Sequence, residues 1–227
     1  MTPLLLIPGM MCGARMWGDL APLGRDIHHH LPDQVDSMPA LAALVLQTAP
    51  PRFALAGLSM GGIVAMEILR QAPTRVTHLA LLDTNPLAET PEAQSRRLPQ
   101  IAKVKAGGLT EVMRDEMKPN YLSEGPHKPQ ILNLCMHMAL TLGPETFIRQ
   151  SRALATRPDQ TATLAAFHGP ALVLMGAQDG LCPRARHDLM HELMPQSRLF
   201  IVDDAAHLPP LENPTQTLAA LSRWLED

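Results

Sequence analysis

Short apolar runs alternate along the chain with segments whose apolar residues recur at helical spacing. A short apolar run is typical of a buried strand, and apolar residues at i, i+3 and i+4 are typical of an amphipathic helix. Strands are predicted at 3–7, 26–30, 52–56, 76–82, 171–175 and 198–202. Helices are predicted over 15–23, 39–48, 60–71, 184–194 and 214–226. This alternation indicates an α/β protein, with a mostly parallel sheet of about six strands and helices on both faces.

One connection between two predicted strands is far longer than the others. About 80 residues separate Asn85 from His168, whereas a link in an α/β fold usually takes a handful of residues plus its helix. The interval has its own helical patterns, interrupted by prolines. We interpret residues 86–167 as a helical cap over the carboxyl ends of the strands, where ligands bind in open α/β sheets. Residues 1–85 and 168–227 then form the core, and a helical addition behind the sheet is the alternative.

Composition is that of a globular protein and argues against several classes of partner. The 227 residues are 46% hydrophobic and 18% charged, with a formal net charge of −3. No basic stretch indicates binding to nucleic acid or to an anionic membrane. No apolar run reaches the length of a membrane span and no basic leader is present, so a cytoplasmic protein is expected. Cys12, Cys135 and Cys182 show neither pairing nor metal spacing, which agrees with a reducing compartment.

The hexapeptide GLSMGG, residues 57–62, follows one predicted strand and begins a predicted helix. A strand that turns directly into a helix bends sharply, and glycines remove the Cβ atoms that would collide there. A serine at such a bend, here Ser59, projects its hydroxyl out of the sheet at a helix N-terminus, where N–H groups favour negative charge. The alternative is an ordinary glycine-rich turn, because Gly-x-Ser-x-Gly is short enough to occur by chance.

A serine becomes an effective nucleophile when a base takes its proton and a third group orients that base. Asp179 follows the fifth predicted strand within GAQDGLCP, and His207 follows the sixth within AAHLPPLENP. Both are expected at the sheet edge that displays Ser59. Asp83, at the end of the fourth predicted strand, is a competing acid. The run 28–30 (HHH) alternates between the faces of a short strand and cannot converge on one metal ion. Acyl transfer by a serine with its base and acid requires no metal or organic cofactor, so none is expected.

These motifs together resemble the α/β-hydrolase fold superfamily, in particular its small capped carboxylesterase-like members. The matching pieces are GLSMGG, GAQDGLCP, AAHLPPLENP and the long insertion. The resemblance implies that Ser59 is the nucleophile, His207 the general base and then acid, and Asp179 the residue that orients the imidazolium. Many relatives begin with an extra antiparallel hairpin. Here the loop after the first strand already starts at residue 8, so about six strands are expected.

The same resemblance implies an oxyanion hole built from two backbone N–H groups. One belongs to the residue after the nucleophile, Met60, and the other to the loop after the first strand. That loop reads IPGMMCG over residues 7–13, with Pro8 where relatives commonly have the histidine of a His-Gly pair. The substitution removes a side chain that often braces the loop. By position Met10 is the expected donor, with Met11 as the second choice.

The substrate pocket is expected to have methionine and other apolar walls, which favour an apolar acyl or aryl group. The residues expected to line it are Met10, Met11, Met60, Leu87, Met113, Met117, Met138 and Phe147. Segment 86–167 holds 10 Lys and Arg residues against 8 acids, an excess too small to indicate an anionic substrate.

The sequence therefore predicts a serine hydrolase that cleaves small to medium carboxylic esters through an acyl-enzyme, with a small-molecule ester as its partner. The resemblance extends to carboxylesterases that cleave pimeloyl methyl esters and to enol-lactone hydrolases. The same fold and residue set also hosts C–C bond hydrolases, lyases, perhydrolases and cofactor-free oxygenases, so these reactions stay open. A non-catalytic ligand-binding protein is the third alternative.

Overall fold

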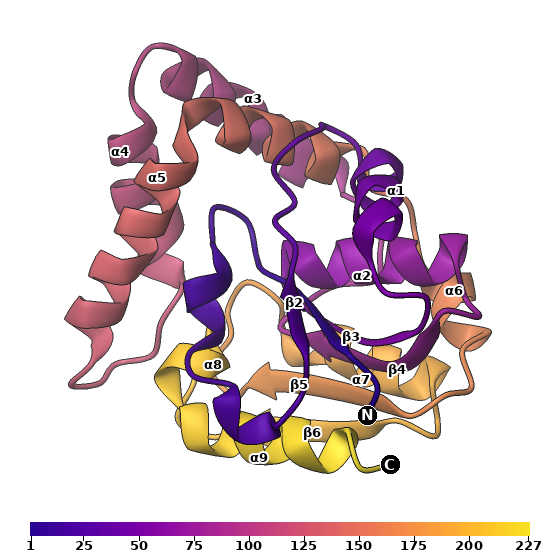
Figure 1. The fold of residues 1–227 in the computed structure, drawn as a ribbon. Helices are drawn as coiled ribbons and strands as arrows, with labels where there is room; N and C mark the ends of the chain where they lie inside the picture. Colours follow the sequence, from indigo (N-terminus) through magenta and orange to yellow (C-terminus); the bar gives the residue numbers. More distant parts are fainter.

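A six-stranded parallel sheet forms the centre of the computed structural model, which describes residues 1–227 (Figure 1). Its strands are β1 (Leu4–Ile7), β2 (Ile27–His29), β3 (Phe53–Leu58), β4 (Val76–Leu82), β5 (Ala171–Gly176) and β6 (Arg198–Val202). They lie in the order β2-β1-β3-β4-β5-β6, and every neighbouring pair is parallel. The predicted sheet is therefore confirmed. The order reverses beside β1, which makes the carboxyl ends of β1 and β3 a topological switch point.

Both faces of the sheet are covered, which explains why the strands read as continuous apolar runs. In β1, Leu5 and Ile7 pack in one apolar core, whereas Leu4 and Leu6 pack in the other. Helices with buried residues in the first core include α1 (Met38–Thr48), α2 (Met60–Gln71), α6 (Thr161–Ala165) and α7 (Arg184–Leu193). The second core is covered by α9 (Pro214–Trp224), which begins at the Asn213 cap.

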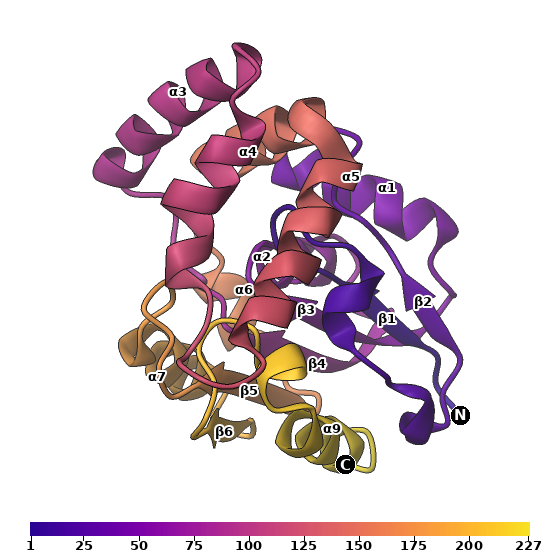
Figure 2. The ribbon, with the colours of Figure 1, turned by 90° about the vertical axis from the view of Figure 1, so that its left-hand side faces the viewer.

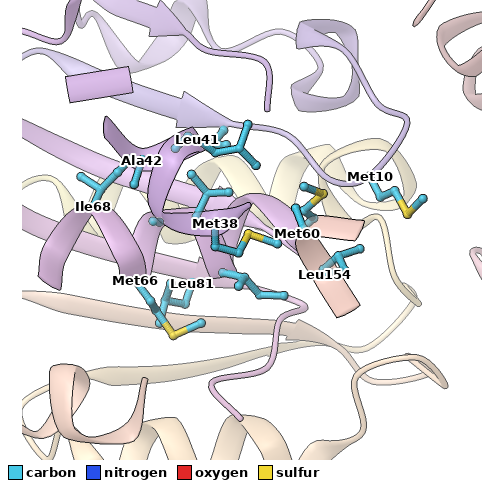
Figure 3. Packing of buried hydrophobic residues seen from close by; sticks show 14 of the residues in the cluster. Met10, Met38, Leu41, Ala42, Met60, Met66, Ile68, Leu81 and Leu154 are labelled. Carbon is cyan, nitrogen blue, oxygen red and sulfur yellow. The ribbon is translucent and has the colours of Figure 1, made fainter. Parts of the chain in front are cut away.

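Methionine side chains fill much of the first core. The chain has 14 methionines and an aromatic content of 3%. Figure 3 shows Met38, Met60 and Met66 packed among leucine, isoleucine and alanine side chains of α1, α2 and the adjacent strands. Flexible thioethers adapt to irregular gaps between elements, so few large rings are needed.

The helices at 38–48, 60–71, 184–193 and 214–224 agree with prediction to within two residues at either end. The predicted helix over 15–23 is wrong. Two short 3-10 helices, η1 (Ala14–Trp17) and η2 (Ala21–Leu23), stand in its place. Gly18 ends the first of them with φ 66° and ψ −152°, and Pro22 offers no N–H for a continuous helix. No helix of the structure has both the length and the apolar composition to cross a bilayer.

The chain between β4 and β5 is mainly helical. Its elements before α6 are α3 (Pro91–Lys105), α4 (Leu109–Glu111), the π-helical η3 (Val112–Met117), η4 (Lys118–Asn120) and α5 (Lys128–Ala155). Both ribbon views place α3, α4 and α5 over one end of the sheet (Figures 1 and 2). The helical patterns expected within this interval include α5, which is broken at Gly143 with φ 78° and ψ 174° before Pro144. The bounds of a separate cap domain, 86–167, stay a prediction.

Candidate functional site

Ser59 lies at the turn between β3 and α2 in a backbone conformation that is uncommon outside glycine, with φ 55° and ψ −119°. Its N–H donates to the carbonyl of Leu82 at 2.9 Å, and its carbonyl accepts from the hydroxyl of Thr84 at 2.7 Å. The end of β4 therefore fixes the turn on both sides. Strained conformations of this kind persist where the surrounding structure over-determines them.

Two glycines of the GLSMGG motif allow backbone to approach backbone beside Ser59. A Cβ added to Gly57 would lie 2.3 Å from the carbonyl oxygen of Gly61. A Cβ added to Gly61 would lie 2.0 Å from the carbonyl oxygen of Ile7. The first turn of α2 can thus pack directly against the ends of β3 and β1 only because these positions have no side chain.

The imidazole of His207 lies between the hydroxyl of Ser59 and the carboxylate of Asp179. Its Nε2 is 3.0 Å from Ser59 Oγ, and its Nδ1 is 2.9 Å from Asp179 Oδ2. His207 and Asp179 are buried, whereas Ser59 is partly exposed. The three residues follow β3, β5 and β6, so the parallel sheet brings their side chains to one edge although Ser59 and His207 are 148 positions apart.

Asp179 is surrounded by donors. Its Oδ1 accepts backbone N–H groups from Leu181 at 2.8 Å and Cys182 at 3.1 Å, and its Oδ2 faces His207. Burial favours the neutral acid, but the hydrogen bond and charge of His207 and the two backbone N–H groups outweigh burial. The pKa of Asp179 therefore lies below its usual value.

Asp83, the competing acid, is fully buried at the end of β4. One of its oxygens accepts the N–H of Gly176 at 2.9 Å, and the other has no hydrogen-bond partner. Burial, together with the charge of Asp179, raises the pKa of Asp83 well above its usual value. No hydrogen bond joins Asp83 to His207, so the geometry pairs the imidazole with Asp179 instead.

Glu212, at the end of α8 (Pro209–Glu212), ties the loop that carries His207 to the inserted segment. Its Oε1 accepts the N–H groups of Ala206 at 3.1 Å and Leu208 at 2.9 Å. Its Oε2 accepts the N–H of Ser123 at 2.7 Å and the hydroxyl of the same residue at 2.8 Å. The N–H of His207 itself donates to the carbonyl of Tyr121 at 2.9 Å. Sequence reasoning gave Glu212 no role.

The loop after β1 leaves one backbone donor free and occupies the next. The N–H groups of Met10 and Met60 have no partner within the protein, whereas the N–H of Met11 donates to Gln150 Oε1 at 2.8 Å. Met11 has φ 56°. The fully buried Gln150 also donates from Nε2 to the carbonyl of Pro32 at 2.9 Å. Gln150 was missed by sequence reasoning because it lies in α5, 139 positions from Met11.

A cavity of about 640 Å³ opens beside Ser59 and His207. Met10, Met60 and Met117 line it, as expected from the sequence. The other residues expected there are not among its lining: Leu87, and the side chains buried in the apolar cores, Met11, Met113, Met138 and Phe147. These four buried residues face the interior of the sheet–helix and helix–helix packing, where apolar periodicity alone cannot distinguish a core position from a pocket position.

The remaining cavity wall is more polar than predicted. Only 12 of the 26 lining residues are hydrophobic, and the inserted segment supplies most of the charged ones. The charged and amide side chains from this segment are Glu89, Arg96, Arg97, Gln100, Glu116, Asn120 and Arg157. Arg96, Arg97 and Gln100 lie on α3, whose single buried residue is Val104.

Asp179, Cys182 and His207 place one potential metal ligand each within 4.8 Å of one another. Both oxygens of Asp179 are already hydrogen-bonded, and one of these contacts is to His207 itself. The hydrogen bonds of Asp179 therefore account for the closeness of these three side chains.

Residues 4–221 match the alpha/beta hydrolase family. The chain belongs to this family. The resemblance drawn from the three motifs and the insertion is thus confirmed, and the six-stranded sheet is the core of an alpha/beta hydrolase fold.

Named relatives of this alpha/beta hydrolase include esterases. The pimeloyl-[acyl-carrier protein] methyl ester esterase of Klebsiella pneumoniae (strain 342) is 27% identical over 237 residues, which cover 93% of this chain and 88% of that protein. A thermophilic esterase from Thermogutta terrifontis, solved with malate bound, is 29% identical with a TM-score of 0.89, covering 100% of this chain and 90% of that chain. The enol-lactonase from Burkholderia xenovorans LB400 has the same fold, at 17% identity and a TM-score of 0.86, covering 100% of this chain and 92% of that one.

The close approach at Gly61 predicts a large effect of one methyl group. We expect Gly61→Ala to lower the free energy of unfolding by at least the ~1–3 kcal/mol typical of overpacking, because the new Cβ meets rigid backbone at Ile7. Urea titration followed by circular dichroism measures the change. Gly125→Ala is the matched control, since nothing lies within 4 Å of its added Cβ. Equal unfolding midpoints for the two variants would contradict the packing described.

Proposed function

We propose that this alpha/beta hydrolase cleaves carboxylic esters through an acyl-enzyme formed on Ser59. The observation that carries the proposal is the position of His207, 3.0 Å from the hydroxyl of Ser59 and 2.9 Å from the carboxylate of Asp179. A hydroxyl, a base within hydrogen-bond reach and a group that orients the base are the components that nucleophilic catalysis requires. They lie on the rim of a cavity with room for a small to medium ester.

In the first step, Ser59 Oγ attacks the ester carbonyl carbon while Nε2 of His207 takes its proton. Asp179 holds Nδ1–H of the imidazole and stabilises the imidazolium. The developing oxyanion accepts hydrogen bonds from the free N–H groups of Met10 and Met60. Collapse of the tetrahedral intermediate expels the alcohol, which takes the proton from His207. A water molecule activated by His207 then releases the carboxylic acid and restores Ser59.

Gln150 holds the loop after β1 in place, a role that Pro8 cannot fill because it lacks the side chain of the histidine that relatives commonly have there. Its carbonyl oxygen holds the N–H of Met11, and this hydrogen bond fixes a non-glycine residue at φ 56° directly after the free donor of Met10. Because Gln150 is fully buried and bonds on both ends of its amide, its position is well defined. We therefore assign Gln150 as a positioning residue for Met10.

The relatives support an ester as substrate. One is named for cleavage of a pimeloyl-[acyl-carrier protein] methyl ester, and the thermophilic relative is called an esterase. Enol-lactone cleavage uses the same acyl chemistry, and the enol-lactonase shares the fold. A panel of p-nitrophenyl esters, enol lactones and vinylogous diketones separates these reactions. Turnover of the diketones alone would favour the C–C bond hydrolase that the fold also permits.

Covalent labelling tests the role of Ser59. We expect a fluorophosphonate probe to label the protein once and to abolish hydrolysis of short p-nitrophenyl esters. Ser59→Ala should lose both labelling and turnover with its unfolding midpoint unchanged, since the substitution removes one partly exposed oxygen. Ser95→Ala, at an exposed serine of α3, is the control and should behave as the parent protein. Undiminished labelling of Ser59→Ala would remove the basis for the proposed mechanism.

Paired amide substitutions test the choice of acid. We expect Asp179→Asn to lower kcat/KM by about 10⁴-fold, because an amide at this position favours the wrong imidazole tautomer. Asp83→Asn should leave kcat/KM within about tenfold of the parent value, because Asp83 does not contact the imidazole. Steady-state kinetics on one p-nitrophenyl ester measures both variants. A larger loss of kcat/KM for Asp83→Asn than for Asp179→Asn would assign the role of the acid to Asp83, at the end of β4.

A substitution that conserves side-chain volume tests whether Gln150 positions Met10. Gln150→Met removes both hydrogen bonds of the side chain at similar volume, so Met11 loses its partner and Met10 its fixed position. We expect kcat to fall by roughly ten- to a hundredfold, less than the ~10²–10³-fold of losing an oxyanion donor outright, with KM changing little. Gln130→Met, at an exposed position of the same helix, is the control. A higher KM at unchanged kcat would assign Gln150 to substrate binding instead.

A further inference from the structure

Two arginines share one glutamate in the wall of the cavity beside Ser59. Arg97 donates from Nε and Nη2 to Glu89 Oε2 at 2.8 and 2.5 Å, and Arg157 Nη1 lies 3.2 Å from Glu89 Oε1. All three line the cavity. Their side chains are nearly buried, at 17% exposed for Arg97, 9% for Arg157 and 5% for Glu89. This Arg97–Glu89–Arg157 cluster joins α3 to the chain after α5.

The cluster has one more cation than anion. Both oxygens of Glu89 are used by the two guanidinium groups, and Arg157 Nε donates to the carbonyl of Leu87 at 2.9 Å. Nη1 of Arg97 and Nη2 of Arg157 have no partner within the protein. Burial lowers the pKa of Arg157, opposed by the charge of Glu89, and repulsion from Arg97 and Arg186 lowers it further. An excess charge held in a nearly buried site is costly without a counter-charge.

The other charged residues of this wall do not supply that counter-charge. Glu116 is already bound by Lys103 at 2.5 Å and by Gln100 at 3.1 Å. Arg96, the neighbour of Arg97 on α3, also lines the cavity and adds a third arginine to this wall. A salt bridge that served only to hold α3 in place would need one arginine for the one carboxylate of Glu89. The composition of segment 86–167 did not reveal this excess of positive charge, because the excess arises from the placement of three arginines on one wall of the cavity.

We propose that the Arg97–Glu89–Arg157 cluster binds a carboxylate carried by the ester substrate, at the end away from the bond that is cleaved. The inference rests on the proposed function and narrows its substrate class. Arginine N–H groups match the geometry of a carboxylate, and the two unpartnered nitrogens supply the donors. Apolar residues of the same cavity, including Met60, Ile63 and Leu154, suit a hydrocarbon chain between the two ends. The substrate class is therefore a half-ester of a dicarboxylic acid.

Matched esters test the proposal. Monomethyl esters of four- to seven-carbon dicarboxylic acids are compared with neutral methyl esters of the same chain length, and kcat/KM is measured for each pair. We expect the carboxylate-bearing ester to be preferred by about tenfold or more at one or more chain lengths, as for a hydrogen bond to a charged group. Free dicarboxylates of that length should inhibit competitively, whereas inorganic phosphate at the same concentration should not.

Substitutions test which arginine causes the preference for the carboxylate-bearing ester. Arg157→Met should lower the ratio of kcat/KM between the two esters by about tenfold, whereas Arg157→Lys, which keeps the charge, should retain part of it. Arg114→Met removes a charge from an exposed position outside the cavity and should leave the ratio unchanged. Thermal melts identify a variant that fails to fold. If Arg157→Met fails to fold, Arg96→Gln, at an exposed arginine of the cavity wall, provides the second measurement. We expect it to lower the ratio of kcat/KM between the two esters by less than Arg157→Met would.

The outcomes separate this inference from the proposed function. Hydrolysis of both esters with equal efficiency, or a preference that Arg157→Met and Arg96→Gln both leave intact, overturns the carboxylate site while the esterase stands. Inhibition by phosphate as strong as that by dicarboxylates would replace the carboxylate with a phosphate group. Failure of the parent protein to turn over any ester or to accept the fluorophosphonate probe overturns the proposed function itself.

Discussion

The packing of the first turn of α2 against the end of β1 is the contact on which the rest of the site depends. The backbone at Gly61 lies so close to the carbonyl of Ile7 that no side chain fits between them. This contact sets Ser59 beside the loop that follows β1, where a Cβ added to Gly9 would lie 3.4 Å from the Cβ of Ser59. The parallel sheet places Asp179 and His207, which follow β5 and β6, at the same edge as Ser59. A change at the Gly61 contact therefore affects Ser59, the loop that follows β1 and the core at once.

The inserted helical segment belongs to the site and does not merely cover it. Gln150 of α5 holds the loop after β1 through Met11, and Tyr121 and Ser123 hold the loop of His207, the latter through Glu212. Both loops that flank Ser59 are thus fixed by hydrogen bonds from the same insertion. It follows that the geometry at Ser59 is a property of the whole chain. The core without the insertion lacks the partners of Met11 and His207.

Much of the architecture could be predicted because its signals are local. The strands are buried on both faces and read as apolar runs, and α2 and α9 begin at sharp signals, the GLSMGG turn and the Asn213 cap. Ser59, Asp179 and His207 could be placed together because each follows a strand, and parallel strands end at one edge. The helix over 15–23 failed because Gly18 and Pro22 override the apolar spacing. Gln150 and Glu212 could not be found, since their partners are distant in sequence or are backbone groups that carry no motif. The polar cavity wall was missed because α3 presents charges that look like an ordinary solvated surface.

The break in α5 has a geometrical consequence for the whole molecule. Before Gly143, the residues Ile131, Cys135 and Met138 belong to the core on one face of the sheet and Ala139 to the core on the other, which also holds all of the buried apolar residues after Gly143. Figure 2 shows the two halves running in different directions. A straight helix of these 28 residues would be about 42 Å long. Because it bends at Gly143, this one helix contributes buried side chains to the apolar cores on both faces of the sheet and so links them.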